Sequence, residues 1–129
     1  MANKKNLLLI GIDPSLIDFT GPEFAAFPGL TAEKVEAGIK GSITQLMELG
    51  YETELCWTDF GQTASSVIEK HLQNKEYDGV LIGAGIRVPA ANFLLFEKMI
   101  NSIHEYAPQS KICFNTNPMD TIAAVQRWI

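Results

Sequence analysis

Two short apolar runs constrain the fold of this chain more than any other feature. Residues 6–12 and 79–82 are almost wholly apolar. Runs of this length suit strands that are buried on both faces of a parallel sheet. A helical pattern follows each run, and the same strand-then-helix unit occurs four times with no low-complexity linker between units. This repetition predicts an α/β protein.

The other two predicted strands belong at the edges of the sheet. Residues 51–58 alternate in polarity and place Glu52 and Glu54 on one face, and residues 111–115 are short and mixed. An inner position would bury both glutamates at a cost, so the strand order 2-1-3-4 is favoured over the order 3-2-1-4 of dinucleotide-binding folds. We therefore expect a flavodoxin-like three-layer αβα sandwich with a parallel four-stranded sheet.

Apolar residues at helical spacing predict a helix after each strand. The first helix begins at the cap residue Thr31 and ends at residues 49–50, and the second covers about residues 63–74. The third helix covers about residues 90–106. The fourth has Asn117 as its cap and a proline at its first position, and it runs to the end of the chain.

The third predicted helix is apolar around more of its circumference than one contact with a sheet requires. Two interpretations stay open. The additional apolar residues either pack against a neighbouring helix or form a homodimer interface, since exposed apolar patches mark contacts between proteins. The residues assigned to this interface are Phe93, Phe96, Ile100 and Ile103.

Length and charge exclude several classes of protein. The 129 residues suit a single α/β domain, residues 1–129, with one core. The net charge is −5, and ten scattered lysines and arginines do not form the basic surface that nucleic-acid-binding proteins carry. No apolar run approaches the roughly 20 residues needed to cross a bilayer. We therefore expect no nucleic-acid partner and no membrane partner.

The cysteines indicate a reducing compartment. Cys56 and Cys113 fall on opposite edge strands of the predicted sheet, three strand spacings of about 4.8 Å apart, which is beyond the reach of a disulfide. Reduced thiols are typical of a cytoplasmic protein. His71 and His104 form no metal-ligand spacing with each other or with a cysteine, so we expect no metal site.

A ligand site is expected at the carboxyl ends of the strands. In an open parallel sheet, ligands bind where successive connections leave in opposite directions, which lies between strands one and three for the order 2-1-3-4. The loops after these strands, together with the end of strand four, supply the candidate ligand-binding residues Asp13, Ser15, Gly83, Gly85, Arg87, Asn115 and Asn117.

These candidates have structural alternatives to their functional roles. Gly83 and Gly85 can cradle an anion with open backbone N–H groups, or they can simply permit a tight turn. Arg87 can hold a carboxylate or phosphate through two hydrogen bonds, or it can lie at the surface. Asp13 can bind a metal, act as a general base or accept a hydrogen bond from a hydroxyl, or it can cap a turn with Pro14.

Known catalytic and cofactor motifs do not match this chain. The dinucleotide fingerprint needs a third glycine where Val88 stands, and it normally follows the first strand, so no cofactor is assigned. Ser15 replaces the second aspartate of the haloacid dehalogenase signature. Residues 83–85 stand where receiver domains carry a phosphorylated aspartate, and Ser15 lacks the following histidine of a serine hydrolase. No catalytic residue is therefore assigned.

Residues 14–30 make an unusually long connection between a strand and a helix. Such loops are commonly lids or binding loops. Phe19, Phe24 and Phe27 can close over a ligand, or they can pack onto the sheet edge and the third helix as part of a packed Ω-like loop.

Three segments carry a resemblance to known proteins. They are residues 11–14 (Gly-Ile-Asp-Pro), 77–87 (Tyr-Asp-Gly-Val-Leu-Ile-Gly-Ala-Gly-Ile-Arg) and 113–118 (Cys-Phe-Asn-Thr-Asn-Pro). Through them the chain resembles, along its whole length, a group of small microbial α/β proteins of unassigned function. The resemblance implies a shared fold and carries no activity, so no catalytic role is transferred from it.

Two functions from different classes remain as hypotheses. The first is the binding, with or without turnover, of a small anionic or polar metabolite between the loops that carry Asp13 and Arg87. The second is a non-catalytic, homodimeric interaction or regulatory module, in which the glycine loop is only a turn and the third helix forms the contact.

Overall fold

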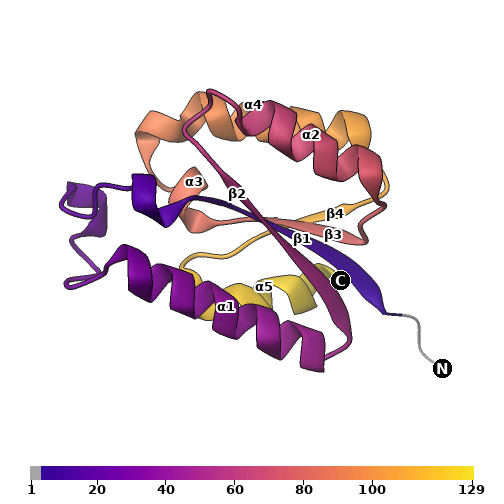
Figure 1. Ribbon diagram of the computed structural model, residues 1–129, viewed down its shortest axis with the longest axis horizontal. Coiled ribbons are helices and arrows are strands. Elements are labelled where there is room, and N and C mark those ends of the chain that lie inside the picture. Colours follow the sequence, from indigo (N-terminus) through magenta and orange to yellow (C-terminus); the bar gives the residue numbers. More distant parts are fainter. Residues whose placement is uncertain (1–3) are drawn as a thin grey trace.

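Four parallel strands form the central sheet of the computed structural model, which describes residues 4–129 without the side chains of residues 23 and 118 (Figure 1). The strands are β1 (Lys5–Ile12), β2 (Tyr51–Thr58), β3 (Gly79–Ile82) and β4 (Lys111–Phe114). Their order is β2-β1-β3-β4, and every neighbouring pair is parallel. The order predicted from the apolar pattern is therefore confirmed.

Helices cover both faces of this sheet (Figure 1). The helices are α1 (Ala32–Glu48), α2 (Ala64–Asn74), the single turn α3 (Ala84–Arg87), α4 (Phe93–Tyr106) and α5 (Thr121–Trp128). One face carries α2 and α4 and the other carries α1 and α5, so the predicted three-layer sandwich is confirmed. Short 3-10 turns are found at Pro14–Leu16, Pro22–Phe24, Ala90–Asn92 and Pro118–Asp120.

The central strands are buried because the two layers of helices cover them. All four residues of β3 are buried, as are four consecutive residues of β1. Alternate side chains enter two separate cores: Leu8 and Val80 point to the layer of α2 and α4, and Leu7 and Leu81 to the layer of α1 and α5. This pattern is why both strands are apolar throughout rather than alternating.

Helix starts lie where capping residues stand in the sequence. The Thr31 side chain accepts a hydrogen bond from the Lys34 N–H at 3.2 Å and begins α1. Asn117 and Asp120 form a capping box before α5, with the Asn117 side chain accepting from the Met119 N–H at 2.7 Å. The Thr31 cap is confirmed, whereas Asn117 caps the 3-10 turn Pro118–Asp120 and the residue before α5 is Asp120.

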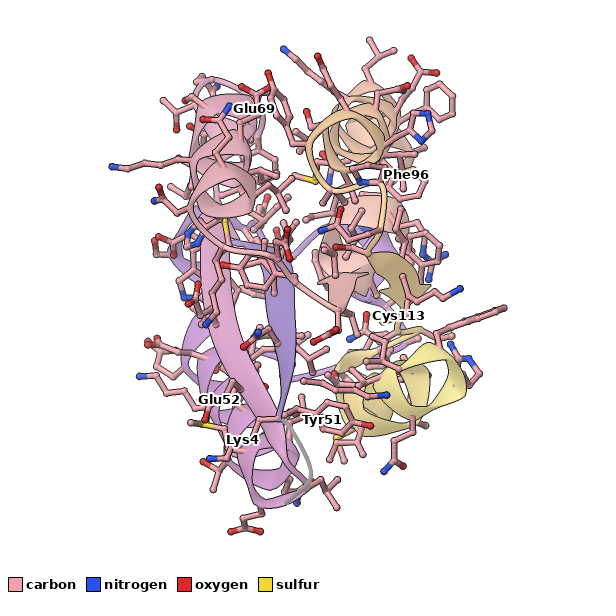
Figure 2. The ribbon with its side chains drawn as sticks, turned by 90° about the vertical axis from the view of Figure 1, so that its right-hand side faces the viewer. Lys4, Tyr51, Glu52, Glu69, Phe96 and Cys113 are labelled. Carbon is pink, nitrogen blue, oxygen red and sulfur yellow. The ribbon has the colours of Figure 1, made fainter. Side chains whose placement is uncertain are left out.

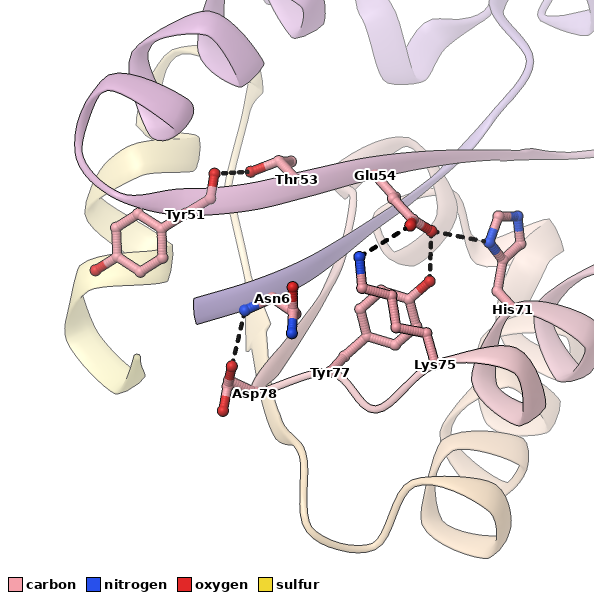
Figure 3. Close-up of polar contacts among 8 residues, drawn as sticks. All are labelled: Asn6, Tyr51, Thr53, Glu54, His71, Lys75, Tyr77 and Asp78. Carbon is pink, nitrogen blue, oxygen red and sulfur yellow. Dashed lines mark hydrogen bonds and ion pairs between the residues drawn. The ribbon is translucent and has the colours of Figure 1, made fainter. Parts of the chain in front are cut away.

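The edge strand β2 places Glu54 in a cluster of polar side chains (Figure 3). Its carboxylate accepts hydrogen bonds from the Tyr77 hydroxyl at 2.5 Å and from Lys75 Nζ at 3.2 Å, and it lies 3.5 Å from His71 Nδ1. The Tyr77 hydrogen bond is the largest influence lowering the pKa of Glu54, while partial burial acts in the opposite direction. These contacts provide hydrogen-bond and ionic partners for the partly buried Glu54 carboxylate on the edge strand.

The wide apolar surface of the third predicted helix is explained mainly by its neighbour α2. Ile103 is fully buried in the core that α4 and α2 share, while Phe96 and Ile100 are partly buried and pack against that core. The predicted homodimer surface is therefore wrong for Ile103, because α2 and the sheet cover it. Of the assigned residues, Phe93 is the one that stays largely exposed, at 62%, and its neighbour Leu94 is 73% exposed.

Cys56 and Cys113 are buried free thiols on the two edge strands, as the predicted strand order requires. Burial raises the pKa of each thiol to about 11. Among the described helices, none combines the length and the apolar character needed to cross a membrane.

Candidate functional site

The loops that follow the four strands meet at one end of the sheet, on the left in Figure 1. A pocket with a cavity volume of about 120 Å³ opens at this end. It lies between the long loop after β1, the start of α1, the α3 turn after β3 and the loop after β4. The lining residues are Ile17, Phe19, Phe24, Phe27, Leu30, Val35, Ala84, Gly85, Val88, Pro89, Thr116 and Asn117.

The long loop of residues 14–30 supplies the aromatic wall of the pocket. Phe19, Phe24 and Phe27 all line the cavity, and the rings of Phe19 and Phe24 lie 5.0 Å apart between centroids at an angle of 54°. Asp18 holds the turn between the two 3-10 segments by accepting hydrogen bonds from the N–H and the hydroxyl of Thr20. The loop is therefore held by its own contacts and contributes three aromatic side chains to the pocket lining.

Gly85 leaves room for the pocket. A Cβ atom built at this position meets no other atom within 4 Å, and the backbone is not in the left-handed region. The adjacent Gly83 differs, because a Cβ there would lie 3.3 Å from the carbonyl oxygen of Ile10. Its N–H donates to that same oxygen at 2.9 Å. Gly83 therefore permits the close contact with β1, while Gly85 lines the cavity and has open space at its Cβ position.

Arg87 is used within the protein and does not line the pocket. Its Nη2 donates a hydrogen bond to the carbonyl oxygen of Asn115 at 2.9 Å, and its guanidinium carbon lies 5.8 Å from the centre of the Phe114 ring. Its Nε is buried and has no hydrogen-bond partner among the described residues. The guanidinium thus connects α3 to the end of β4, and it is not presented to a ligand in the pocket.

Asp13 and Ser15 form a turn at the end of β1, outside the pocket lining. Asp13 Oδ1 accepts hydrogen bonds from the N–H of Ser15 at 2.9 Å and from its hydroxyl at 2.8 Å. The Asp13 N–H donates to the carbonyl oxygen of Thr58 at 2.9 Å. This arrangement matches the turn-capping alternative for Asp13.

The two candidate asparagines after β4 occupy different environments. Asn115 is buried: its Oδ1 accepts from the Ala84 N–H at 2.8 Å and its Nδ2 donates to the Thr121 hydroxyl at 3.0 Å. It therefore joins α3 to the start of α5. Asn117 is half-buried and lines the pocket together with Thr116. Of the seven candidates, Gly85 and Asn117 line the cavity.

Two aspartates adjoin lining residues of the pocket: Asp18 in sequence, and Asp120 through hydrogen bonds from the Thr116 and Asn117 N–H groups. The Thr20 side-chain hydrogen bond is the largest influence lowering the pKa of Asp18, which stands between two lining residues. At Asp120 burial acts to raise the pKa, and hydrogen bonds from Thr116 and Asn117 outweigh it and lower the pKa. The lining itself contains no titratable side chain. The lining therefore offers no charged side chain to a ligand, and its polar side chains are Thr116 and Asn117.

Several lining residues are not among the candidates drawn from the sequence. Val88 and Pro89 follow the glycine loop directly, and Thr116 stands between the candidates Asn115 and Asn117. Their positions after β3 and β4 are the sequence feature that could have identified them as lining residues. Val35 belongs to the apolar stripe of α1, which predicts a core position. Its place at the first turn of that helix brings it under the long loop instead.

The fold and the pocket together define a three-layer α/β protein with flavodoxin-like strand order and an apolar cavity at the carboxyl edge of its sheet. In the described part of the chain, no three His, Cys, Asp or Glu side chains are placed to hold one metal ion. No protein-family model matches the chain, and a search of curated proteins found no significant similarity.

Proposed function

We propose that the protein binds a small polar metabolite with an apolar part about the size of one ring, at the carboxyl edge of its sheet. The observation that carries this proposal is the pocket built jointly by the loops after β1, β3 and β4. Ligand pockets are typically apolar with a few polar groups that orient the ligand. Here Thr116 and Asn117 are the polar side chains of the lining.

The size of the cavity supports a ring-sized apolar part. Its volume of about 120 Å³ is close to that of an apolar cavity of about 150 Å³ that accepts benzene. The ring would lie among Phe19, Phe24 and Phe27, because aromatic side chains pack well against another flat apolar group. A polar substituent would then reach Thr116 and Asn117 at the pocket edge.

The charge of the ligand is inferred to be neutral or positive. Arg87, the expected anion-binding residue, donates to Asn115 and lies outside the lining, whereas Asp120 accepts hydrogen bonds from the N–H groups of the lining residues Thr116 and Asn117. An anion in the cavity would be taken out of water without a cationic side chain in the lining, which is unfavourable. Because the lining lacks a titratable side chain, the proposal concerns binding and assigns no acid–base catalyst. The free thiols support a cytoplasmic setting.

A filled-pocket variant tests the proposal. Gly85→Leu places a side chain into open space without backbone strain, and Gly41→Leu is its control, since Gly41 is exposed on α1 and a Cβ there also meets nothing within 4 Å. Wild type and both variants are heated with single-ring compounds in neutral, cationic and anionic sets. A ligand at 100 times its Kd stabilises the fold by about 2.7 kcal/mol, which raises Tm by roughly 5–10 °C.

We expect neutral or cationic rings to raise the Tm of the wild type and of Gly41→Leu but not of Gly85→Leu. The Gly85→Leu protein itself should be at least as stable as wild type, because replacing a glycine in a helical turn with leucine stabilises the turn by up to about 1 kcal/mol. The proposal fails if no compound stabilises the wild type. It also fails if Gly85→Leu responds to the same compounds as the wild type does.

A homodimeric interaction module is the second candidate, and the exposure of two neighbouring side chains favours it. Phe93 and Leu94 are 62% and 73% exposed at the start of α4. Adjacent large apolar side chains on a surface are typical of a contact with another protein. Sedimentation equilibrium of the wild type and of Leu94→Glu tests it, and a monomeric wild type at high concentration rules out the homodimer.

A further inference from the structure

The outer edge of β4 borders a second cavity, which shares no lining residue with the pocket at the carboxyl edge. This groove has a volume of about 360 Å³. It is lined by the end of α4, the start of β4 and the end of α5, through Ile103, His104, Ala107, Pro108, Ser110, Lys111, Ile112 and Trp128. Figure 2 shows the sheet edge near Cys113 flanked by α4 and α5, with no ribbon outside the strand.

One side of the β4 backbone has no strand beside it in the described structure. β4 pairs with β3 alone. The Lys111 N–H donates to the carbonyl oxygen of Asp78, just before β3, at 3.0 Å. Successive residues of a strand direct their backbone groups to alternate sides. The N–H and C=O groups of Ile112 and Phe114 therefore point away from β3. Arg127 Nη2 donates to the Phe114 carbonyl at 3.0 Å. The Ile112 N–H and C=O and the Phe114 N–H therefore face the open edge.

The groove lining combines Trp128, Lys111 and His104 with apolar side chains and Ser110. Trp128 is 60% exposed and forms one wall of the groove, and exposed tryptophan is characteristic of interfaces. Lys111 lies in the lining and is exposed, and Arg127 stands beside Trp128. The lining contains no acidic side chain, although the chain as a whole carries a net charge of −5.

We propose that this groove binds an extended, acidic segment of a partner protein, which adds a fifth strand beside β4. Backbone hydrogen bonds to an open strand edge provide affinity in this kind of recognition, and side-chain pockets provide selectivity. The flavodoxin-like order 2-1-3-4-5 places its fifth strand at this position. Glutamates or aspartates of the segment lie near Lys111, and an apolar residue packs on Trp128.

Charge selects this occupant over a second copy of the chain. Pairing two β4 edges would bring the Lys111 and Arg127 side chains of both copies together, which opposes association through like-charge repulsion. An acidic segment instead gains from the same charges. The attraction should weaken with added salt, because the basic groups are at the surface.

A tethered strand tests the proposal on the full chain. Ile129 follows the groove residue Trp128, so a flexible linker of about eight Gly and Ser residues can join it to a seven-residue probe that alternates Glu with Val and Thr. Tethering gives an effective concentration in the millimolar range. The control fusion carries Lys in place of each Glu. Amide hydrogen exchange is measured by NMR for both fusions and for the untethered chain.

We expect exchange at the Ile112 and Phe114 amides to slow about tenfold or more in the Glu fusion relative to the untethered chain. The Lys111 and Cys113 amides, which face β3, serve as internal references. Lys111→Glu and Trp128→Ala should each reduce the protection by roughly fivefold. Lys70→Glu on the exposed surface of α2 changes the net charge equally and should leave the protection unchanged.

The proposal is overturned if the Glu fusion leaves both outward amides unprotected. At the high effective concentration that the tether gives, weak affinity does not account for a lack of protection. Equal protection by the Lys fusion also overturns it, since charge would then have no role. Protection that increases with protein concentration in the untethered chain indicates pairing with a second copy and likewise contradicts the proposal.

Discussion

Asn115 is the residue whose environment most changes its expected role. As the first polar residue after β4, it was a candidate ligand-binding residue. The structure buries it, with one side-chain hydrogen bond to the Ala84 N–H and another to the Thr121 hydroxyl. Both ends of the amide are therefore used to fix the α3 turn and the α5 start in place. Asn115 therefore affects a ligand by positioning α3 and the start of α5 and not by direct contact.

Asn115→Ala should destabilise the protein by about 2–3 kcal/mol, because it leaves the half-buried Ala84 N–H without its acceptor and a small cavity in place of the buried amide. Asn117→Ala is the matched control at the pocket, where the loss of the bond to the Met119 N–H should cost about 1 kcal/mol. Urea denaturation of both variants measures the difference. Equal free energies of unfolding for the two variants would contradict the structural role of Asn115.

Arg87 is a second residue whose contacts the local sequence does not reveal. Its sequence context, a glycine loop after a buried strand, is typical of anion-binding loops. Nothing in that context indicates that its guanidinium donates to the carbonyl of Asn115, which lies 28 positions away in the chain. Local sequence therefore placed Arg87 at the correct edge of the sheet and did not reveal its partner.

At the scale of elements, the edge strand β2 depends on the Glu54 cluster shown in Figure 3. The pKa of Glu54 is lowered mainly by the Tyr77 hydrogen bond. A lowered carboxyl pKa stabilises the folded state above the ordinary pKa of about 4.3. That stabilisation is lost as pH falls through the lower folded pKa, so the relevant window lies below about pH 5.

Glu54→Gln should lower the free energy of unfolding at pH 7, and its difference from wild type should shrink as pH falls from about 5 to 3. Glu52→Gln is the control on the same strand, since Glu52 pairs with Lys4 at the exposed surface. That variant should change stability by less than about 0.5 kcal/mol. Denaturation midpoints across this pH range provide the measurement, and a difference that grows at low pH would contradict the sign.

Element boundaries were predictable where the signals are local. The bounds of β2 and β3 and the cap of α1 agree with the structure because alternation, burial and capping involve near neighbours. The segment near residue 90 differs. There the chain forms a separate 3-10 turn, and α4 begins at Phe93. Asn92 lies at this break, and its side chain donates to the Gly85 carbonyl at 3.2 Å.

At the scale of the whole molecule, the two thiols report on global unfolding. Cys56 and Cys113 lie on opposite edge strands and in different cores, and both are buried. Burial raises the pKa of each to about 11. At pH 8 roughly a thousandth of each thiol would be ionised even where reagent has access.

We expect a thiol reagent to label both cysteines slowly and at the same rate in the native protein, because each becomes reactive only when the molecule unfolds. In denaturant both should react at once. Mass spectrometry of the two cysteine peptides over time separates the rates. Labelling of one cysteine well ahead of the other would show that its edge of the sheet opens independently.

The sequence by itself determined the strand order, the layers and the edge at which a pocket lies. These properties depend on which segments are apolar on one face or both, and that pattern is written along the chain. Only the tertiary structure decided which side chains face the pocket. It placed Phe19 and Gly85 in the lining and directed Arg87 to Asn115, because such contacts join loops distant in sequence and depend on side-chain directions that no local pattern fixes.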